Sequence, residues 1–428
     1  MSDSLIAVFF CTYIEKEITM KFIHAADIHL DSPFSGLIQK SNLPAKLETA
    51  IKESTFNSFK QIVADAISNE VDFVIIAGDL FDRNERSIAA DAFINDQFKL
   101  LDERNIPVFL IFGNHDFFNF DNKTLSYPDN VHVFNNEVTT KEITLDNGQT
   151  VDLSGFSFKN QWIHESYADS FPVKGNSDWA IGIMHGSADS IDSPEANYAP
   201  FSVGQLESKH YDYWALGHIH KRQSLNDAKT INYSGNSQGR SINESGDKGY
   251  LLVSSQGDKL VPEFKKTAVI DWQLLTIDVD NLDTNQIVET TMSRLAELQL
   301  TTTTLVRVVF KTERPNAEIS MNINNGDLLA VIQSANSKEL SALNAFVVSL
   351  KYQVNDSKID TPLDQEFFDQ ATTDVLNGQT IDEYKNLFGN YDFILDDLNN
   401  SESVDEILQT SQQLISEKVN YGQEDTEN

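Results

Sequence analysis

Five apolar, strand-like runs of this chain each end in residues that can bind a metal ion. The clusters at these ends are "DIHLD" (27–31), "GDLFDRN" (78–84), "GNHD" (113–116), "MHG" (184–186) and "GHIH" (217–220). Because ligand sites in open α/β sheets form at the carboxyl ends of strands, we expect the clusters to converge on one pocket. The side chains that would meet there are Asp27, His29, Asp79, Asn114, His185, His218 and His220.

The order of the elements predicts stacked layers of sheet and helix. Strand patterns at 21–27, 71–79 and 106–114 alternate with helical patterns at about 45–69 and 86–103. After residue 130 the pattern changes to that of a second sheet, beginning with a hairpin around an "NG" turn. A sheet-on-sheet sandwich flanked by helices is therefore expected over residues 20–265.

Three further segments surround this expected domain. Residues 1–19 have neither a basic start nor a small-residue cleavage site, so we expect no signal peptide there. This segment is expected to be a disordered extension or a start-site artefact before Met20. The pattern over residues 270–360 predicts a small α/β cap domain. The pattern over residues 361–428 predicts an acidic, mostly helical segment.

Charge and cysteine content limit the classes of function. The formal net charge of −33 argues against a broadly basic nucleic-acid surface. Nearly half of the excess lies beyond residue 356, where about eighteen acidic residues face about three basic ones. The single cysteine, Cys11, excludes an internal disulfide framework and favours a reducing cytoplasm. The sequence contains no apolar run of membrane-spanning length, so no membrane partner is expected.

The expected ligands combine imidazole, carboxylate and amide groups. This mixture favours Mn²⁺, Fe²⁺ or Zn²⁺, whereas an all-oxygen set would favour Mg²⁺ or Ca²⁺. A carboxylate can bridge two such ions, and an ion pair can polarise a phosphate and activate water against it. Hydrolysis of a phosphoester needs this help because the reacting centre already carries negative charge.

The ordered set D-x-H, G-D-x-x-(D/N), G-N-H-(D/E), H and G-H-x-H resembles the signature of the calcineurin-like metallophosphoesterases. More narrowly, "HAADIHLD" and "GDLFD" resemble the SbcD-type DNA nucleases, and "YSGNSQGRSINESGDKGY" (233–250) resembles their YhaO branch. The resemblance covers about residues 20–260. It implies a four-layer α/β/β/α metallophosphoesterase sandwich with a smaller C-terminal α/β cap domain.

The same resemblance implies roles for individual residues. Asp27, His29 and His220 would hold the first ion, Asn114, His185 and His218 the second, and Asp79 would bridge the two. His115 would contact the phosphate and help the leaving oxygen depart. Asp82 would orient a ligand, and Asp31 and Asp116 are further candidates for that role.

The activity implied is a Mn²⁺-dependent DNA exonuclease, with endonuclease activity also open, in repair or end processing. The resemblance also implies a homodimer and an SMC-like ABC ATPase partner, which would dock on helices in 361–428. Two alternatives remain open. One is a phosphoesterase for nucleotides or other small phosphorylated molecules, and the other is a non-catalytic protein that bridges DNA to the ATPase.

Two interpretations remain open for the basic and for the aromatic side chains near the expected pocket. Basic residues either serve solubility or contact phosphates beyond the scissile one; they are Arg83, Arg86, Lys221, Arg222 and Arg240. Aromatic residues either stack on splayed bases or fill the core; they are Phe81, Phe117, Phe118 and Tyr198. Arg83 and Arg240 are our candidates for substrate binding. His24 is expected to be a hydrogen-bonded core histidine, whereas His132, His164 and His210 show no partner pattern.

Overall fold

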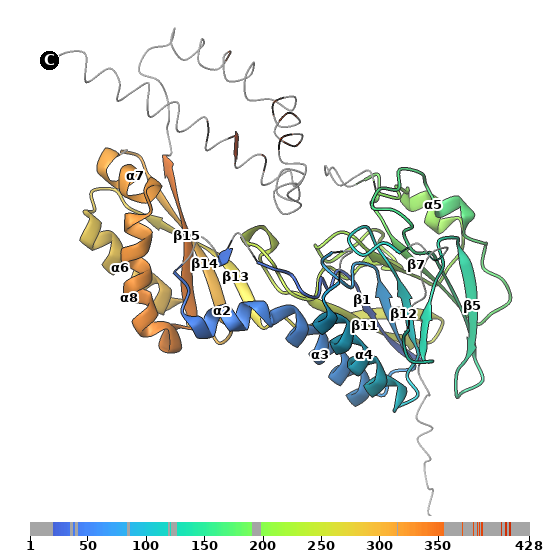
Figure 1. Ribbon diagram of the computed structural model, residues 1–428. Helices are drawn as coiled ribbons and strands as arrows, with labels where there is room; N and C mark the ends of the chain where they lie inside the picture. The colour runs from blue at the N-terminus through green and yellow to red at the C-terminus, as the bar shows by residue number, and fades with distance from the viewer. Residues whose placement is uncertain are drawn as a thin grey trace, which may run out of the picture.

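The computed structural model describes residues 20–354 apart from short gaps, and beyond residue 354 only isolated helical positions. The gaps are 35–36, 39–41, 84–85, 119, 121–125, 191–197 and 315, and the isolated positions are 370, 380, 383, 385, 387, 404, 407, 408 and 411. The expected extension at 1–19 and most of the acidic segment at 361–428 lie outside the described residues. Figure 1 shows a larger unit built around two sheets and a smaller unit, in yellow and orange, built around a third.

The first sheet has the order β12-β11-β1-β2-β3-β4. Its parallel strands are β1 (Lys21–Ala25), β2 (Phe73–Ala77), β3 (Val108–Ile111) and β4 (Val131–Val133). The strands β11 (Gly249–Gln256) and β12 (Lys259–Lys266) add an antiparallel edge beside β1. The helices α3 (Ser54–Ser68) and α4 (Ile88–Asp102) connect β1 to β2 and β2 to β3. The alternation of strand and helix predicted from the sequence is confirmed.

The helix expected at 45–69 is two helices in the structure. The first, α2 (Ala45–Lys52), ends before Glu53, and α3 starts at Ser54. The Ser54 hydroxyl donates a hydrogen bond of 2.7 Å to the carbonyl of Ile51. Serine competes in this way with the regular backbone bonds of a helix, and the single-helix prediction took no account of it.

The second sheet has the order β5-β6-β7-β8-β10-β9. Its strands are β5 (Thr139–Thr144), β6 (Thr150–Gly155), β7 (Trp179–His185), β8 (Tyr213–Gly217), β9 (Gln223–Ser224) and β10 (Ile231–Tyr233). The strands β5 and β6 form the hairpin predicted around the "NG" turn, and β6, β7, β8 and β10 run parallel. A 3-10 turn η1 (Ala168–Ser170) and a short helix α5 (Val203–Glu207) pack with loops on its outer face.

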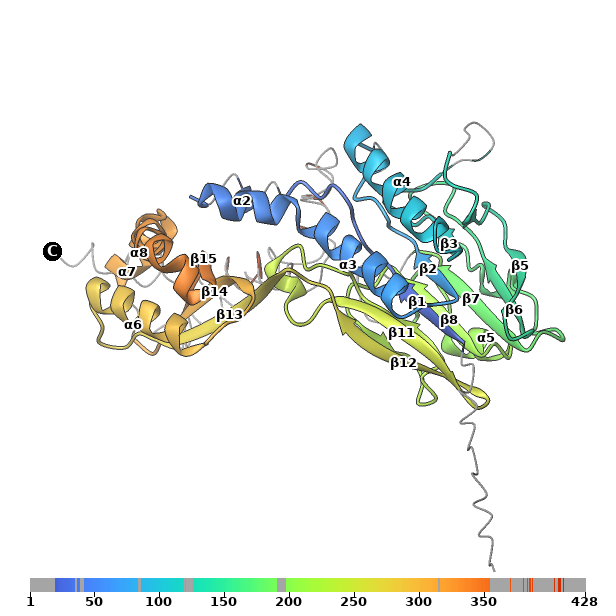
Figure 2. The same cartoon turned by 90° about the horizontal axis from the view of Figure 1, so that it is seen from below.

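The two sheets pack face to face, which confirms the four-layer sandwich. One core lies between the sheets and includes Phe22, Phe73 and Phe109 from the first and Ile181 and Tyr213 from the second. A separate core lies between the first sheet and the helices α3 and α4, which cover that sheet in Figure 2. The central strands β1, β2, β3, β7 and β8 are almost entirely buried, as is typical of parallel strands covered on both faces.

The third sheet is parallel and has the order β13-β14-β15. Its strands are β13 (Ile270–Asp278), β14 (Thr303–Thr312) and β15 (Ala345–Val354), and its helices are α6 (Thr284–Glu297), α7 (Ala317–Asn324) and α8 (Asp327–Leu343). The helices and one face of the sheet share a core of their own. Among the described helices, none is both long and apolar enough to span a bilayer.

The other face of the third sheet packs against the larger unit. Its Trp272 and Phe346 share a cluster with Leu47 of α2, which lies along the third sheet in Figure 2, and with Ile242 of the 3-10 turn η2 (Ile242–Glu244). The indole nitrogen of Trp272 donates a 2.9 Å hydrogen bond to the carbonyl of Gly239. The loop that follows β10 therefore holds the two units together.

His24 lies between the two sheets, as a buried and hydrogen-bonded core histidine. Its Nε2 is 3.1 Å from the carbonyl of Leu216, and its Nδ1 is 3.0 Å from the Tyr213 hydroxyl. Since a carbonyl can only accept, Nε2 carries the proton, and Nδ1 accepts from the hydroxyl. Burial lowers the pKa of His24 to about 3, although the bond to Leu216 works in the opposite direction.

The lowered pKa of His24 predicts that the folded state becomes less stable as the pH falls. Between the usual histidine pKa and about 3, the unfolded chain binds a proton at His24 that the folded chain does not, so stability is lost as pH falls through this window. The slope contributed is up to about 1.4 kcal/mol per pH unit. Urea unfolding at a series of pH values measures how the free energy of unfolding changes with pH. In His24→Gln this slope should be smaller by an amount equivalent to about one bound proton. Parallel pH profiles for the two proteins would contradict the prediction.

Candidate metal centre

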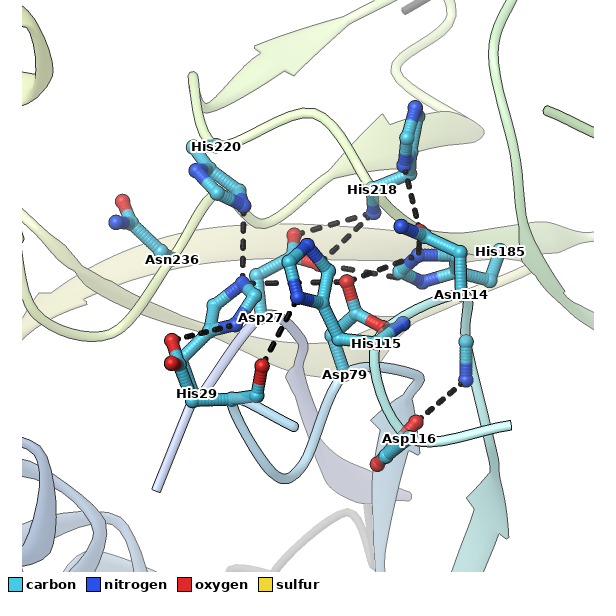
Figure 3. Close-up of polar contacts among 12 residues, drawn as sticks. Asp27, His29, Asp79, Asn114, His115, Asp116, His185, His218, His220 and Asn236 are labelled. Carbon is cyan, nitrogen blue, oxygen red and sulfur yellow. Dashed lines mark hydrogen bonds and ion pairs between the residues drawn. The ribbon is translucent and has the colours of Figure 1, made fainter. Parts of the chain in front are cut away.

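All seven expected ligands lie at the carboxyl ends of parallel strands, and the structure brings them together (Figure 3). Asp27 and His29 follow β1, Asp79 follows β2, Asn114 follows β3, His185 ends β7, and His218 and His220 follow β8. Asp27, His29, Asp79 and His185 are at most 1% exposed. A polar cluster buried this deeply is stable only if its members neutralise one another or share cations.

One half of the cluster surrounds His185. Its Nδ1 lies 3.0 Å from the carbonyl of Ala77, which can only accept, so Nδ1 carries a proton. Its Nε2 lies 2.9 Å from Asn114 Oδ1 and 3.3 Å from Asp79 Oδ2. Nδ1 of His218 is 3.1 Å from the same Asn114 oxygen. Several electron-rich atoms therefore face one another, and a proton or a cation must lie among them.

The raised pKa of His185 also indicates that positive charge is favoured at this position. Burial alone would lower the pKa of this imidazole. The Asp79 and Asp27 carboxylates outweigh burial and raise the pKa to about 9. A divalent cation would meet this demand and leave His185 neutral, which is the form that binds metals.

The other half of the cluster joins His29 and His220. Their Nε2 atoms lie 3.0 Å apart, so the two ring nitrogens face each other closely enough to be ligands of one ion. A carboxylate oxygen of Asp27 groups with both rings, and the three ligand atoms all lie within 4.8 Å of one another. Asp79 Oδ2 is 3.9 Å from His29 Nε2 and 3.3 Å from His185 Nε2. Asp79 thus lies between the halves, where a bridging carboxylate is needed.

These donors fit a pair of divalent ions. The set is nitrogen and oxygen without thiolate, which suits Mn²⁺, Fe²⁺ or Zn²⁺ in a reactive site. One buried atom, Nδ1 of His29, has no hydrogen-bond partner among the described residues, and the Asp82 carboxylate lies 3.6 Å from it. A cation on the Nε2 side would strengthen the attraction between this ring and Asp82.

Three glycines leave the space that His185 fills. A Cβ at Gly78 would lie 2.2 Å from Nδ1 of His185, and a Cβ at Gly113 would lie 2.6 Å from its Nε2. A Cβ at Gly217 would lie 1.9 Å from the carbonyl oxygen of Ala77. The glycines at the ends of β2, β3 and β8 are therefore required by close approach to this ring and its acceptor.

The backbone around the ligands is strained. Asp27, His29, Asp79 and His218 have φ values of 50°, 48°, 50° and 99°, a region that residues other than glycine rarely adopt. Bonds between the loops after β1 and β2 hold this shape, since the backbone nitrogens of Asp27 and His29 donate to the carbonyls of Gly78 and Asp79. Strain of this kind persists only where the surroundings enforce it.

Glu244 is a site residue that the sequence interpretation missed. Its Oε1 lies 2.7 Å from Nδ1 of His220, on the ring edge opposite the cluster. Its Oε2 accepts from the Asn236 side chain at 2.7 Å and from the Arg240 backbone nitrogen at 2.6 Å. Burial would raise the pKa of Glu244, but His220 and Arg240 hold it far below its ordinary value. The only sequence signal was its place within 233–250, the segment that supports the YhaO resemblance.

His115 lies beside the cluster with a fixed orientation. Its backbone nitrogen donates to Asp79 Oδ1 at 3.0 Å, and its Nδ1 lies 3.0 Å from the carbonyl of Asp82. Because that carbonyl accepts, Nδ1 carries a proton, and the state of Nε2 is left to its surroundings. The ring packs edge-on against His29 with centroids 4.8 Å apart.

The three other expected carboxylates differ in position. Asp82 accepts from Ser32 Oγ at 3.0 Å and pairs with Arg240, beside His29. Asp116 is buried and accepts from the backbone nitrogens of Gly113 and Leu80, both at 2.8 Å, so it ties the loops after β2 and β3 together. Asp31 is exposed.

The flanking basic residues separate into two groups. The Arg86 guanidinium packs over the Phe81 ring at 4.5 Å and donates to the Tyr127 hydroxyl, which makes it structural. Arg222 packs on Phe264 in a similar way, and Arg240 is held by carboxylates. Arg83, Lys221 and Arg222 are exposed, and Arg83 Nε is 3.8 Å from Asp82.

The candidate aromatic residues also differ in what they contact. Phe81 and Phe118 are 1% and 7% exposed and belong to the core against α3 and α4, so they fill space rather than present a face. Phe117 packs against the outer core of the second sheet. Tyr198 is different because its ring lies 4.9 Å from that of His218.

Comparison with known proteins gives one family match. The calcineurin-like phosphoesterase family matches residues 20–222. The chain is 38% identical over 282 residues to the "Uncharacterized metallophosphoesterase YhaO" of Bacillus subtilis. That alignment covers 64% of this chain and 68% of the relative.

Two more distant relatives have names that include DNA repair or nuclease. The "DNA double-strand break repair protein Mre11" of Methanococcus maripaludis is 26% identical over 283 residues, covering 58% of this chain and 67% of the relative. A component of the SbcCD nuclease of Staphylococcus epidermidis is 25% identical over 274 residues, covering 57% of this chain and 68% of the relative.

The glycine packing predicts that Gly113→Ala blocks one ion. The added methyl would lie 2.3 Å from Asp79 Oδ1 and 2.6 Å from His185 Nε2, so it would crowd two of the expected ligands. Calorimetric titration with Mn²⁺ should show two ions bound by the parent chain and one by the variant. The matched control is Gly204→Ala, where the methyl meets none of the described residues within 4 Å. Equal stoichiometry in all three proteins would refute this assignment.

The Glu244 contact predicts weaker metal binding in Glu244→Gln. The amide keeps the shape but removes the charge that orients His220, and such partners typically change metal affinity by about 10- to 100-fold. The affinity for Mn²⁺ at the site that includes His220 should fall by this factor in the same titration. The exposed Glu103→Gln serves as control. An unchanged affinity would show that Glu244 does not support the ligand.

Proposed function

Since this chain belongs to the calcineurin-like phosphoesterase family, we propose that it is a two-metal phosphodiesterase that hydrolyses DNA. The proposed activity is exonucleolytic, with endonucleolytic cleavage as a second activity, in repair or end processing. The observation that carries the proposal is Asp79, whose carboxylate lies between the two groups of ligands. The names of the Mre11 and SbcCD relatives support DNA as the substrate.

In this proposal Asp27, His29 and His220 bind one divalent cation, and Asn114, His185 and His218 bind the other. The cations, Mn²⁺ in our proposal with Fe²⁺ or Zn²⁺ as alternatives, supply a Lewis acid and activate water for attack on the phosphodiester. The protein holds the donors in place before binding, through the Ala77 carbonyl on His185 and Glu244 on His220. Such preorganisation lowers the cost of assembling the site.

His115 is the proposed catalytic residue of the chain itself. Its Nδ1 lies 3.0 Å from the Asp82 carbonyl, which orients the ring, and the proposed role of Nε2 is a hydrogen bond to the phosphate or to the leaving oxygen. Asp82 acts by position, since its carboxylate adjoins His29 and its carbonyl adjoins His115. Arg83, half exposed next to Asp82, is the proposed contact for a neighbouring phosphate. Arg240 is the second proposed contact, although two carboxylates already offset its charge.

The remaining proposals concern the rest of the chain. We propose a catalytic domain at 20–265, a cap at 270–360 that shapes access for a DNA end, and a cytoplasmic location. An SMC-like ABC ATPase would dock on helices in 361–428, and the chain would form a homodimer. Among the described helical positions of this segment, the apolar side chains of Leu387 and Ile407 are 74% and 41% exposed.

Hydrolysis of small phosphorylated molecules is the second candidate function. The net charge of −33 favours it, because a strongly acidic chain repels a long polyanion more than a small one. A non-catalytic bridging protein is less favoured, since a full set of buried donors is costly to keep without a catalytic role. Metal-reconstituted protein, assayed on end-labelled linear DNA and on small phosphodiesters, separates the three.

The expected result is Mn²⁺-dependent cleavage of linear DNA that Asp79→Asn abolishes. Loss of the central carboxylate charge removes the bridge, so both hydrolysis and tight binding of the second ion should disappear. Faster cleavage of small phosphodiesters than of DNA would favour the second candidate. Absence of cleavage of either substrate by metal-loaded protein would leave the bridging role.

His115→Gln should separate catalysis from metal binding. If His115 assists the leaving group, kcat should fall by about 10²- to 10⁴-fold while two Mn²⁺ ions still bind. Single-turnover cleavage and calorimetric titration measure the two quantities independently. The surface variant His210→Gln is the control. A normal kcat in His115→Gln would exclude the proposed role.

A further inference from the structure

Trp162 combines exposure with an ordered stack of rings. Its side chain is 49% exposed, whereas Trp179, Trp214 and Trp272 are 5%, 1% and 7% exposed. The indole stacks on the ring of Tyr198, with centroids 5.0 Å apart and planes 24° apart. The ring of His164 lies nearly parallel to it on a second contact, at 6.4 Å and 22°.

This stack leads directly to the metal centre. Tyr198 is 8% exposed and lies between Trp162 and His218, with its ring centroid 4.9 Å from that of the histidine. Trp162 is therefore one ring removed from an expected metal ligand. This aromatic surface is therefore linked through one ring to the centre at which the proposed function places the phosphate.

The backbone fixes the stack in place. The nitrogen of Ala199 donates a 2.7 Å hydrogen bond to the carbonyl of Ile163, and the nitrogen of Ser187 donates to the carbonyl of Tyr198 at 2.9 Å. Ile163 is 6% exposed and belongs to the core on the outer face of the second sheet. The backbone next to Trp162 and at Tyr198 is thus anchored, which limits the positions open to the two stacked rings.

We propose that Trp162, supported by Tyr198 and His164, is a stacking platform for an unpaired nucleobase next to the scissile phosphate. This inference rests on the proposed function and specifies its substrate as single-stranded DNA or a frayed end. A base within a duplex is already stacked on its neighbours, so its faces are not available to an indole. Stacking on an aromatic side chain is indifferent to sequence, because every base has a π-face.

The net negative charge of the chain makes an uncharged mode of DNA binding useful. With a net charge of −33, the chain as a whole repels phosphates rather than attracting them. Stacking needs no positive charge and is worth about 1–3 kcal/mol per base, or about 5- to 150-fold in affinity. The platform therefore offers a mode of binding that suits an acidic chain.

The test compares two polymers with the same phosphates. One is a thymidine dodecamer, and the other is a dodecamer of abasic residues. The full-length, Mn²⁺-loaded chain should cleave the thymidine polymer with the higher kcat/KM, and Trp162→Ala should lower the ratio of the two values by about 5- to 150-fold. Trp162→Phe, which keeps an aromatic ring against Tyr198, should retain part of the ratio. Leu100→Ala, which removes an exposed apolar side chain from α4, is the control.

A binding measurement tests the stacking platform independently of DNA cleavage. Indole fluorescence should be quenched by the thymidine polymer and not by the abasic one, and the quenching should be absent in Trp162→Phe. If the parent chain cleaves neither polymer, the proposed DNA hydrolysis fails, and the fluorescence result alone decides on the platform.

Two results would overturn the platform. One is an equal ratio in the parent chain and Trp162→Ala together with equal quenching by both polymers. The other is a change of mass in light scattering for Trp162→Ala with an unchanged ratio, which would identify the exposed indole as a contact between protein chains.

Discussion

The structure depends on one geometric constraint, which is that the parallel strands of both sheets end at the same edge. Strands β1, β2 and β3 from one sheet and β7 and β8 from the other deliver their last residues to a single buried volume. Carboxylates and imidazoles concentrated there would repel one another or remain unsatisfied in a dry interior. Their mutual approach, with Asp79 at the centre, is stable because positive charge is shared among them.

The sandwich and the converging ligands could be predicted because both signals are local. A strand buried on both faces is a continuous apolar run, and the donors follow within a few residues of its end. The family resemblance rested on those same short segments, and the comparison with known proteins confirmed it. All seven expected ligands lie in the cluster, and His24 lies in the core as expected.

The remaining features depend on contacts between distant segments. Glu244 reaches His220 from 24 positions away, and nothing in its own neighbourhood marks it as a partner of a ligand. Arg86 was a candidate for phosphate contact, but it packs on the rings of residues that fill the core. At the break between α2 and α3, a serine hydroxyl bonds to the backbone of the preceding turn. Patterns of hydrophobic spacing carry no information about such pairings.

The loop after β10 has two attachments, and its position affects both. At one end Glu244 holds His220, and at the other the carbonyl of Gly239 accepts from Trp272 of the third sheet. A rotation of the third sheet must therefore break that bond or carry the loop, and with it the carboxylate behind a ligand. Coupling of this kind is reciprocal, so an ion bound at His220 would in turn affect the orientation of the smaller unit. The metal centre and the third sheet would therefore affect each other through the two contacts of this one loop.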